Sequence, residues 1–277
     1  MRGAPPLPVG STIGILGGGQ LARMLCAAAA RLGYRTVVLE PDGRCPAAQL
    51  ANAVIDAPYT DAAALRRLAE EADVVTYEFE NVDHDSALRL SRNVVLAPPA
   101  QALAVSQDRA AEKRFFEGVG IPVSPWREID GAGDLVEALS AFGGGVLKTR
   151  RFGYDGKGQL LFHPDARNAW ADADAAFADL ATRPGGLVLE RFVPFACEIS
   201  IIATRATDGT IVTWPVARNT HRDGILRQSR VPATGVAPAA LDMARNMARR
   251  LLDGLDYVGT VGLELFVLDD GSLLANE

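Results

Sequence analysis

The sequence predicts an α/β protein built from two lobes. Apolar runs of strand length alternate with amphipathic segments of helix length along most of the chain. One glycine-rich turn joins the first such run to a helix, and a second, cationic glycine-rich loop follows a strand near the middle. At 277 residues, 48% of them hydrophobic, the chain exceeds one ordinary domain and can bury a large interior.

In the first lobe, strands and helices are expected to alternate after a loose, proline-rich start. The helix that follows the first strand has apolar positions at Leu21, Leu25, Ala28 and Leu32 and is stopped by Gly33. A second helix is expected to start at Thr60 and to cover residues 61–70. The expected strands are residues 12–16, 36–39, 54–55, 73–77 and 94–96.

Two features of this lobe suggest a ligand. Gly17–Ala22 nearly matches G-x-G-x-x-G/A, and Glu40 follows the second strand, so the literal interpretation is dinucleotide binding. The same glycines also serve close packing of a helix on a sheet. Glu78, Glu80 and Asn81 follow the strand 73–77, where they could hold an amine or ribose hydroxyls, or form a solvated loop.

The second lobe is expected to begin with a helix over residues 107–118 and a turn-rich joint over 118–125. Further helices are expected at 133–142, 165–180 and 238–255. Expected strands are 145–149, 159–162, 186–190, 198–206, 210–214 and 259–268, with hairpin turns at Thr207–Gly209 and Asp269–Gly271.

The loop after the strand 145–149 is the strongest candidate for an anion site. Lys148 ends the strand, and the loop adds three glycines and three more cations. Glycines let main-chain N–H groups approach an anion closely, while lysine and arginine side chains supply positive charge. The loop is either a lid over a polyphosphate or a solvated basic turn.

Two carboxylates near the end of the chain form the second candidate site. Glu264 lies within an apolar strand, and pairing about the Asp270-Gly271 turn brings it to the same end of a hairpin as Asn276 and Glu277. Carboxylate and amide oxygens suit Mg²⁺, whereas the alternative is an exposed acidic strand face. A second polar, cationic cluster runs over residues 218–224 and 227–230 and includes His221. A solvated loop would account for Arg222, but less well for His221 and Arg218, which lie just after an apolar strand.

Composition excludes several classes of function. The net charge of −6 argues against non-specific nucleic-acid binding. Cys26, Cys45 and Cys197 are too far apart to suggest a disulfide framework or a zinc site. The sequence shows neither a membrane-length apolar run nor a signal peptide, so a cytoplasmic location and no membrane partner are expected.

Taken together, these motifs resemble the ATP-grasp superfamily and, within it, the 5-(carboxyamino)imidazole ribonucleotide synthases. The matching residues are Ile15–Met24, Thr76–Val82, Lys148 with Gly153–Gln159, Asn219–His221 with Asp223–Leu226, and Asn276-Glu277. The resemblance implies an ATP-grasp fold with a Rossmann-like (pre-ATP-grasp) N-terminal domain over 1–105. The ATP-grasp domain then covers 106–277, with a lid subdomain near 133–192. It also implies a C-terminal part of the family fold beyond Glu277, and a homodimer.

The resemblance also implies a reaction and residue roles. ATP, bicarbonate and aminoimidazole ribonucleotide give the carboxyamino product, ADP and phosphate. ATP is held by Lys148, Gly153, Tyr154, Asp155, Gly156, Lys157, Gly158, Gln159, Glu190, Arg191, Phe192, Val193, Glu198, His221, Asn276 and Glu277, and Mg²⁺ by Glu264 and Glu277. The implied substrate contacts are Gly19, Gln20, Glu78, Glu80, Tyr154, Asp155 and Lys157.

Within that set, the implied catalytic residues are Asp155, Tyr154 and Lys157, with Asp155 managing the amine proton. Lys157 stands where many relatives have arginine. The turn at residues 17–20 is expected to receive the 5′-phosphate of the substrate. Two alternatives stay open: another ATP-grasp ligase, such as a formate-dependent transformylase or a biotin carboxylase, and a dinucleotide-dependent oxidoreductase. A non-catalytic nucleotide-binding module is a third.

Overall fold

The computed structural model describes residues 5–78, 80–153, 158–165, 173–222 and 225–277. The chain divides into two compact units. Unit 1 comprises Met1–Ala104, Thr204–Ile211 and Leu255–Thr260, and unit 2 comprises Val105–Ala203, Val212–Gly254 and Val261–Glu277. Among the described residues, no helix has the length and apolarity needed to cross a membrane.

Unit 1 contains a parallel four-stranded sheet in the order β3-β2-β1-β4. Its strands are β1 (Thr12–Leu16), β2 (Arg35–Glu40), β3 (Ala53–Asp56) and β4 (Val74–Tyr77). Ile15 is the register partner of Val38 on β2 and of Thr76 on β4. The connecting helices are α1 (Gln20–Arg31), η1 (Pro46–Gln49) and α2 (Ala62–Glu71), followed by α3 (His84–Leu90) and α4 (Ala100–Ser106). The last two helices were not predicted from the sequence.

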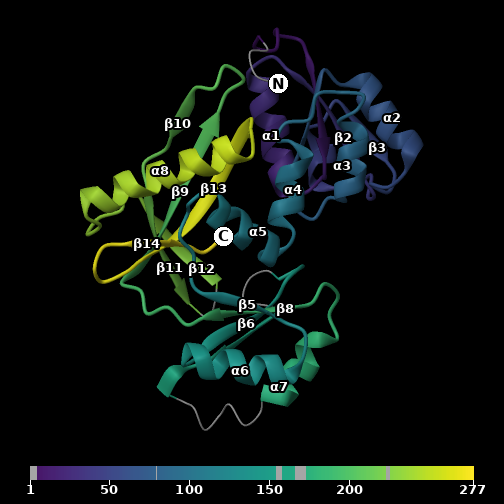
Figure 1. Cartoon of the computed structure of the whole chain (residues 1–277). Helices are drawn as coiled ribbons and strands as arrows, with labels where there is room; N and C mark the ends of the chain where they lie inside the picture. The colour runs from purple at the N-terminus through teal and green to yellow at the C-terminus, as the bar shows by residue number, and fades with distance from the viewer. Residues whose placement is uncertain (1–4, 79, 154–157, 166–172, 223–224) are drawn as a thin grey trace. The chain divides into compact units, whose positions relative to one another are not determined.

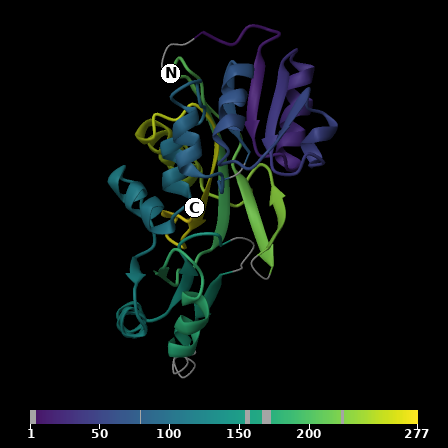
Figure 2. The same cartoon turned by 90° about the vertical axis from the view of Figure 1, so that its right-hand side faces the viewer.

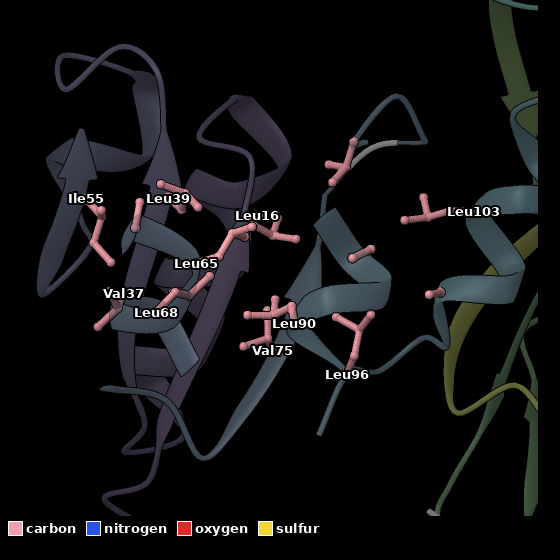
Figure 3. Close-up of a cluster of buried hydrophobic side chains, with 14 residues drawn as sticks. Leu16, Val37, Leu39, Ile55, Leu65, Leu68, Val75, Leu90, Leu96 and Leu103 are labelled. Atoms are coloured by element: carbon pink, nitrogen blue, oxygen red, sulfur yellow. The ribbon is translucent and has the colours of Figure 1, made fainter. Parts of the chain in front are cut away.

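The core of this unit is aliphatic, and Figure 3 shows its leucine, isoleucine and valine side chains between the sheet and the helices. The labelled members are Leu16, Val37, Leu39, Ile55, Leu65, Leu68, Val75, Leu90, Leu96 and Leu103. The side chain of Asp61 accepts hydrogen bonds from the N–H groups of Ala63 and Ala64 and so caps α2. The expected start of this helix at Thr60 is therefore one residue too early.

Helix α1 does not bury the apolar face that was expected. Its small residues Ala22, Cys26 and Ala29 are buried, whereas Leu21 and Leu25 are 58% and 42% exposed. Ala22 and Cys26 belong to one buried cluster with residues of β1, β2 and η1 and with Cys45. The buried face of α1 is therefore lined by alanine and cysteine rather than by leucine.

Unit 2 contains an antiparallel sheet in the order β5-β8-β6-β7. Its strands are β5 (Trp126–Ile129), β6 (Gly145–Thr149), β7 (Gln159–Phe162) and β8 (Leu187–Arg191). Helices α6 (Ala132–Phe142) and α7 (Ala173–Ala181) cover one face of this sheet, as Figures 1 and 2 show. The prediction of a helix from residue 165 covers residues 166–172, which lie outside the described ones. Strand β5 was not predicted.

A second sheet has the order β12-β11-β9-β13-β14, and β10 pairs with β9. The strands are β9 (Cys197–Arg205), β10 (Ile211–Thr213), β11 (Ala217–Arg222), β12 (Ile225–Arg230), β13 (Gly259–Val267) and β14 (Leu273–Ala275), and the helices of unit 2 also include α5 (Arg109–Gly118) and α8 (Pro238–Gly254). Figure 2 shows β11 and β12 as a long hairpin. The cationic cluster from Arg218 to Arg230 therefore lies on two paired antiparallel strands. Its outer strand β12 is exposed at every residue, so it lacks the alternation that marks a half-buried strand.

Candidate functional site

Unit 2 contains a cavity of about 880 Å³, a volume typical of small-molecule sites. Both sheets of the unit and the start of α5 contribute to its walls. It gathers many of the residues that the sequence marked as nucleotide or metal ligands: Lys148, Gly153, Gly158, Gln159, Phe192, Glu198, His221, Glu264, Asn276 and Glu277. Residues from five strands and two loops, distant in the sequence, therefore share one cavity.

Lys148 reaches this cavity from β6, where Val146 is on the same side of the strand. Its ammonium lies 3.0 Å from Oε1 of Glu190 on β8. Burial lowers the pKa of Lys148, and the negative charge of Glu190 opposes that effect. The cavity thus contains an amine whose charge depends on a buried carboxylate.

Glu190 lies beside the cavity without lining it. Its side chain is 3% exposed and lies against Lys148 and Lys113. Phe192 lines the cavity, whereas Arg191 and Val193 do not. The roles of Glu190, Arg191 and Val193 in binding ATP stay predictions.

Arg109 is a cavity residue that the sequence analysis missed. It is the first residue of α5, directly after Asp108, whose side chain caps the helix. One of its guanidinium nitrogens donates a hydrogen bond to Oε2 of Glu277 at 2.9 Å. A cation at the positive end of a helix dipole is unfavourable without an anionic partner. That conflict in the sequence was the signal that could have identified Arg109.

The two predicted metal ligands lie at the same end of a hairpin, as expected. The N–H of Glu264 donates to the carbonyl of Glu277, and the N–H of Asn276 donates to the carbonyl of Glu264. Burial, together with the charges of Glu198 and Glu277, raises the pKa of Glu264 to about 7. Several carboxylates therefore repel one another here. Such repulsion favours a bound proton or cation.

Glu198 lies on β9 and pairs with His221 on β11, with 3.2 Å between Oε1 and Nδ1. Burial raises the pKa of Glu198, while His221 and Asn219 act in the opposite direction. Asn219 is itself buried and accepts a hydrogen bond from the hydroxyl of Ser229 on β12. The exposed hairpin therefore positions a polar pair inside the cavity.

Aromatic rings form a further part of the lining. Phe195 and Phe266 stack with centroids 4.5 Å apart and planes inclined by 11°, and Phe192 contacts His163. The sequence analysis missed Phe195 and Phe266. Phe266 follows Glu264 by two residues, so the period of a strand places both on one face. This alternation could have identified Phe266 before the structure was known.

The glycine turn of unit 1 is occupied by side chains of the protein itself. The N–H groups of Gly19 and Ala22 donate to the two oxygens of Glu78, at 2.5 and 2.7 Å. The N–H of Gly18 donates to Glu40, which also accepts a hydrogen bond from the hydroxyl of Tyr59. These carboxylates oppose both a dinucleotide and the expected 5′-phosphate at this turn, because like charges repel.

Some predicted residues cannot be placed in a site. Tyr154, Asp155, Gly156 and Lys157 lie outside the described residues, so their roles stay predictions. Glu80 is exposed and accepts a hydrogen bond from Asn81. Within the parts of the chain that the structure describes, no group of three or more His, Cys, Asp or Glu residues is arranged to hold a metal.

Comparisons with known proteins agree with this architecture. A ribonucleotide synthetase pre-ATP-grasp domain model matches residues 10–107, and an ATP-grasp domain model matches residues 114–277. The chain is 50% identical to N5-carboxyaminoimidazole ribonucleotide synthase of Brucella melitensis over 98% of its own length and 74% of the relative.

Two solved structures are also similar. The Staphylococcus aureus N5-carboxyaminoimidazole synthetase complexed with ADP has a TM-score of 0.89 and 32% identity, covering 98% of this chain and 70% of that chain. The Aspergillus clavatus synthase in complex with ADP and 5-aminoimidazole ribonucleotide has a TM-score of 0.85 and 27% identity, covering 97% and 69%. The chain belongs to the N5-carboxyaminoimidazole ribonucleotide synthase family of ATP-grasp enzymes.

Proposed function

We propose that this protein uses ATP to carboxylate 5-aminoimidazole ribonucleotide with bicarbonate, in the synthesis of the purine nucleotide IMP. The observation that carries the proposal is the cavity in which Lys148 and Arg109 meet Glu264 and Glu277. Family membership and the relatives' complexes with ADP and 5-aminoimidazole ribonucleotide support the identity of the substrates.

The reaction proceeds in two stages. An oxygen of bicarbonate attacks the γ-phosphorus of ATP, so that ADP leaves and carboxyphosphate forms. Loss of phosphate then releases carbon dioxide, and the amine nitrogen of the ribonucleotide bonds to its carbon and gives up a proton. Catalysis of such phosphoryl transfer rests on positioning and on charge stabilisation. Lys148 and Arg109 supply positive charge for the phosphates.

The carboxylates of the hairpin would hold Mg²⁺. Glu264 and Glu277 provide hard oxygen donors. Burial and, after it, the negative charges of Glu198 and Glu277 raise the pKa of Glu264, and a cation would balance that charge. Two protein carboxylates suit an ion that takes its other ligands from water and phosphate. When bound, Mg²⁺ would neutralise charge on the phosphates. Asn276, on the same hairpin, would donate a hydrogen bond to a phosphate oxygen.

The remaining polar and aromatic groups are assigned to the nucleoside. Phe192 and the stacked pair Phe195 and Phe266 offer flat apolar surfaces suited to adenine. Glu198, held by His221, is proposed to bind the ribose hydroxyls. On the resemblance alone, we assign Tyr154, Asp155 and Lys157 to the ribonucleotide, with Asp155 receiving the amine proton. The homodimer that the resemblance implies and the cytoplasmic location expected from the sequence are also part of the proposal.

The test is ADP release from Mg-ATP, with 5-aminoimidazole ribonucleotide and bicarbonate each present or omitted. We expect ADP release to rise when both acceptors are present, with one carboxylated product formed for each ADP. Release that responds instead to a different acceptor, such as a formylation substrate with formate, would assign the chain to another ATP-grasp reaction. Oxidation or reduction of a nicotinamide cofactor would contradict the proposal outright.

A further inference from the structure

A buried ammonium behind the cavity has no role in the scheme above. Lys113 lies on α5, one turn after Arg109, and is 1% exposed. Its Nζ is 3.1 Å from Oε2 of Glu190, whereas Nζ of Lys148 is 3.0 Å from Oε1. The two lysines therefore occupy opposite oxygens of one carboxylate. Three elements, α5, β6 and β8, meet at this group.

The charges of this group do not cancel. Burial favours a neutral Glu190, but the positive charges of Lys148 and Lys113 outweigh burial and lower the pKa of this carboxyl to about 2. Two ammonium groups thus share one negative charge, which leaves a net charge of +1. With Glu190 and Lys148 alone, the net charge would be zero. Charge inside a protein acts over longer distances than in water, because screening is weaker.

We propose that Lys113 is a positioning residue for phosphoryl transfer, which binds the far oxygen of Glu190 and offsets its negative charge, so that this carboxylate does not cancel the attraction of Lys148 for the ATP phosphates. The inference rests on the proposed function. Lys113 does not line the cavity, so it acts through Glu190 rather than on the nucleotide. Glu190 fixes the position of the Lys148 amine, but its negative charge also neutralises that amine. Lys113 offsets this neutralisation, which explains why a carboxylate is tolerated beside the phosphate-binding lysine.

The test compares Mg-ATP with adenosine, which lacks phosphates, on four proteins: the unmodified chain, Lys113→Met, Glu190→Gln and the double variant. We expect Lys113→Met to weaken Mg-ATP binding on the order of tenfold and to leave adenosine binding unchanged. The double variant restores the net charge of +1 and should regain most of the lost affinity. Equal weakening for both ligands would identify a structural role and overturn the proposal.

The Glu190→Gln background keeps the test decisive if Lys113→Met does not fold. Glu190→Gln and the double variant both lack the carboxylate that Lys113 offsets, and they differ only at residue 113. The two should therefore bind Mg-ATP with similar affinity. A double variant that binds markedly more weakly than Glu190→Gln would show that Lys113 does not act through Glu190 and would refute the inference. Titration calorimetry on each folded protein gives the dissociation constants.

A wrong proposed function and a wrong role for Lys113 would give different results. If the proposed function is wrong, the unmodified chain will not bind Mg-ATP or will show no acceptor-stimulated release of ADP. In contrast, normal activity in the unmodified chain with no effect of Lys113 on Mg-ATP binding would refute only the role of Lys113.

Discussion

At the scale of single residues, the site consists of oppositely charged side chains that are wholly or partly buried. Lys148 and Arg109 each lie against a carboxylate, Glu190 and Glu277 respectively. Burying any one of these charges alone would cost several kcal/mol, so each is paired within the protein. A phosphate can replace a carboxylate as the partner of Arg109, because both are anions that accept from a guanidinium.

Lys148→Ala should weaken Mg-ATP binding on the order of 10- to 100-fold, because a charge-assisted hydrogen bond to phosphate is lost and Glu190 loses one of its two partners. Titration calorimetry measures the effect. Arg245→Ala is the matched control, since Arg245 is an exposed cation on α8, paired with Asp242. Unchanged affinity in Lys148→Ala would remove Lys148 from the nucleotide site.

Mg²⁺ binding to the nucleotide-free protein should depend on pH near neutrality. The pKa of Glu264 is raised to about 7, so protons compete with the cation below that pH. We expect the apparent dissociation constant of Mg²⁺ to rise about tenfold for each pH unit below 7. Glu264→Gln should bind Mg²⁺ weakly and show no such dependence. A flat pH profile in the unmodified chain would contradict the assignment.

The pKa shift of Glu264 also determines how the stability of the fold depends on pH. A carboxyl whose pKa is higher in the folded than in the unfolded state favours folding at low pH, and this contribution is lost as the pH rises through about 7. Without a cation, Glu264 therefore makes the folded state less favourable at pH 8 than at pH 5. A bound cation reverses this effect.

At the scale of elements, the helix caps and the turns were easier to predict from the sequence than the buried faces of the helices and strands. The Asp270-Gly271 turn predicts the pairing of Glu264 with Asn276, because turn position fixes the register of a hairpin. The predicted buried face of α1 was wrong, because Ala22 and Cys26 rather than the leucines join the buried cluster against β1 and β2. Hairpin β11–β12 was not predicted because its outer strand is exposed at every residue.

The capping of α1 by Glu78 provides a test with a matched pair of variants. Glu78→Gln should lower the free energy of unfolding by about 1 kcal/mol, since a negative charge is removed from the positive end of a helix. Glu80→Gln, in the same loop but exposed, should leave that free energy unchanged. Urea denaturation compares the two midpoints. Equal midpoints would show that Glu78 contributes nothing as a cap.

At the scale of the whole molecule, the order of strands and helices along the sequence predicted the fold class. The composition of the site, in contrast, depends on contacts between residues that are distant in the sequence. Alternating strands and helices, the cationic loop and the two glutamates could all be identified from sequence. Phe195 and Lys113 could not, because their roles depend on which distant residue each one meets. Lys113 in particular has the sequence context of an ordinary exposed helix residue, although it is 1% exposed.

Arg109 and Glu277 line the same cavity and neutralise each other there. A triphosphate that takes over the guanidinium frees the carboxylate, and a divalent cation that takes over the carboxylate frees the guanidinium. Each ligand therefore removes a competitor for the other. We expect nucleotide and metal to bind cooperatively, and each should raise the affinity of the protein for the other by the same factor.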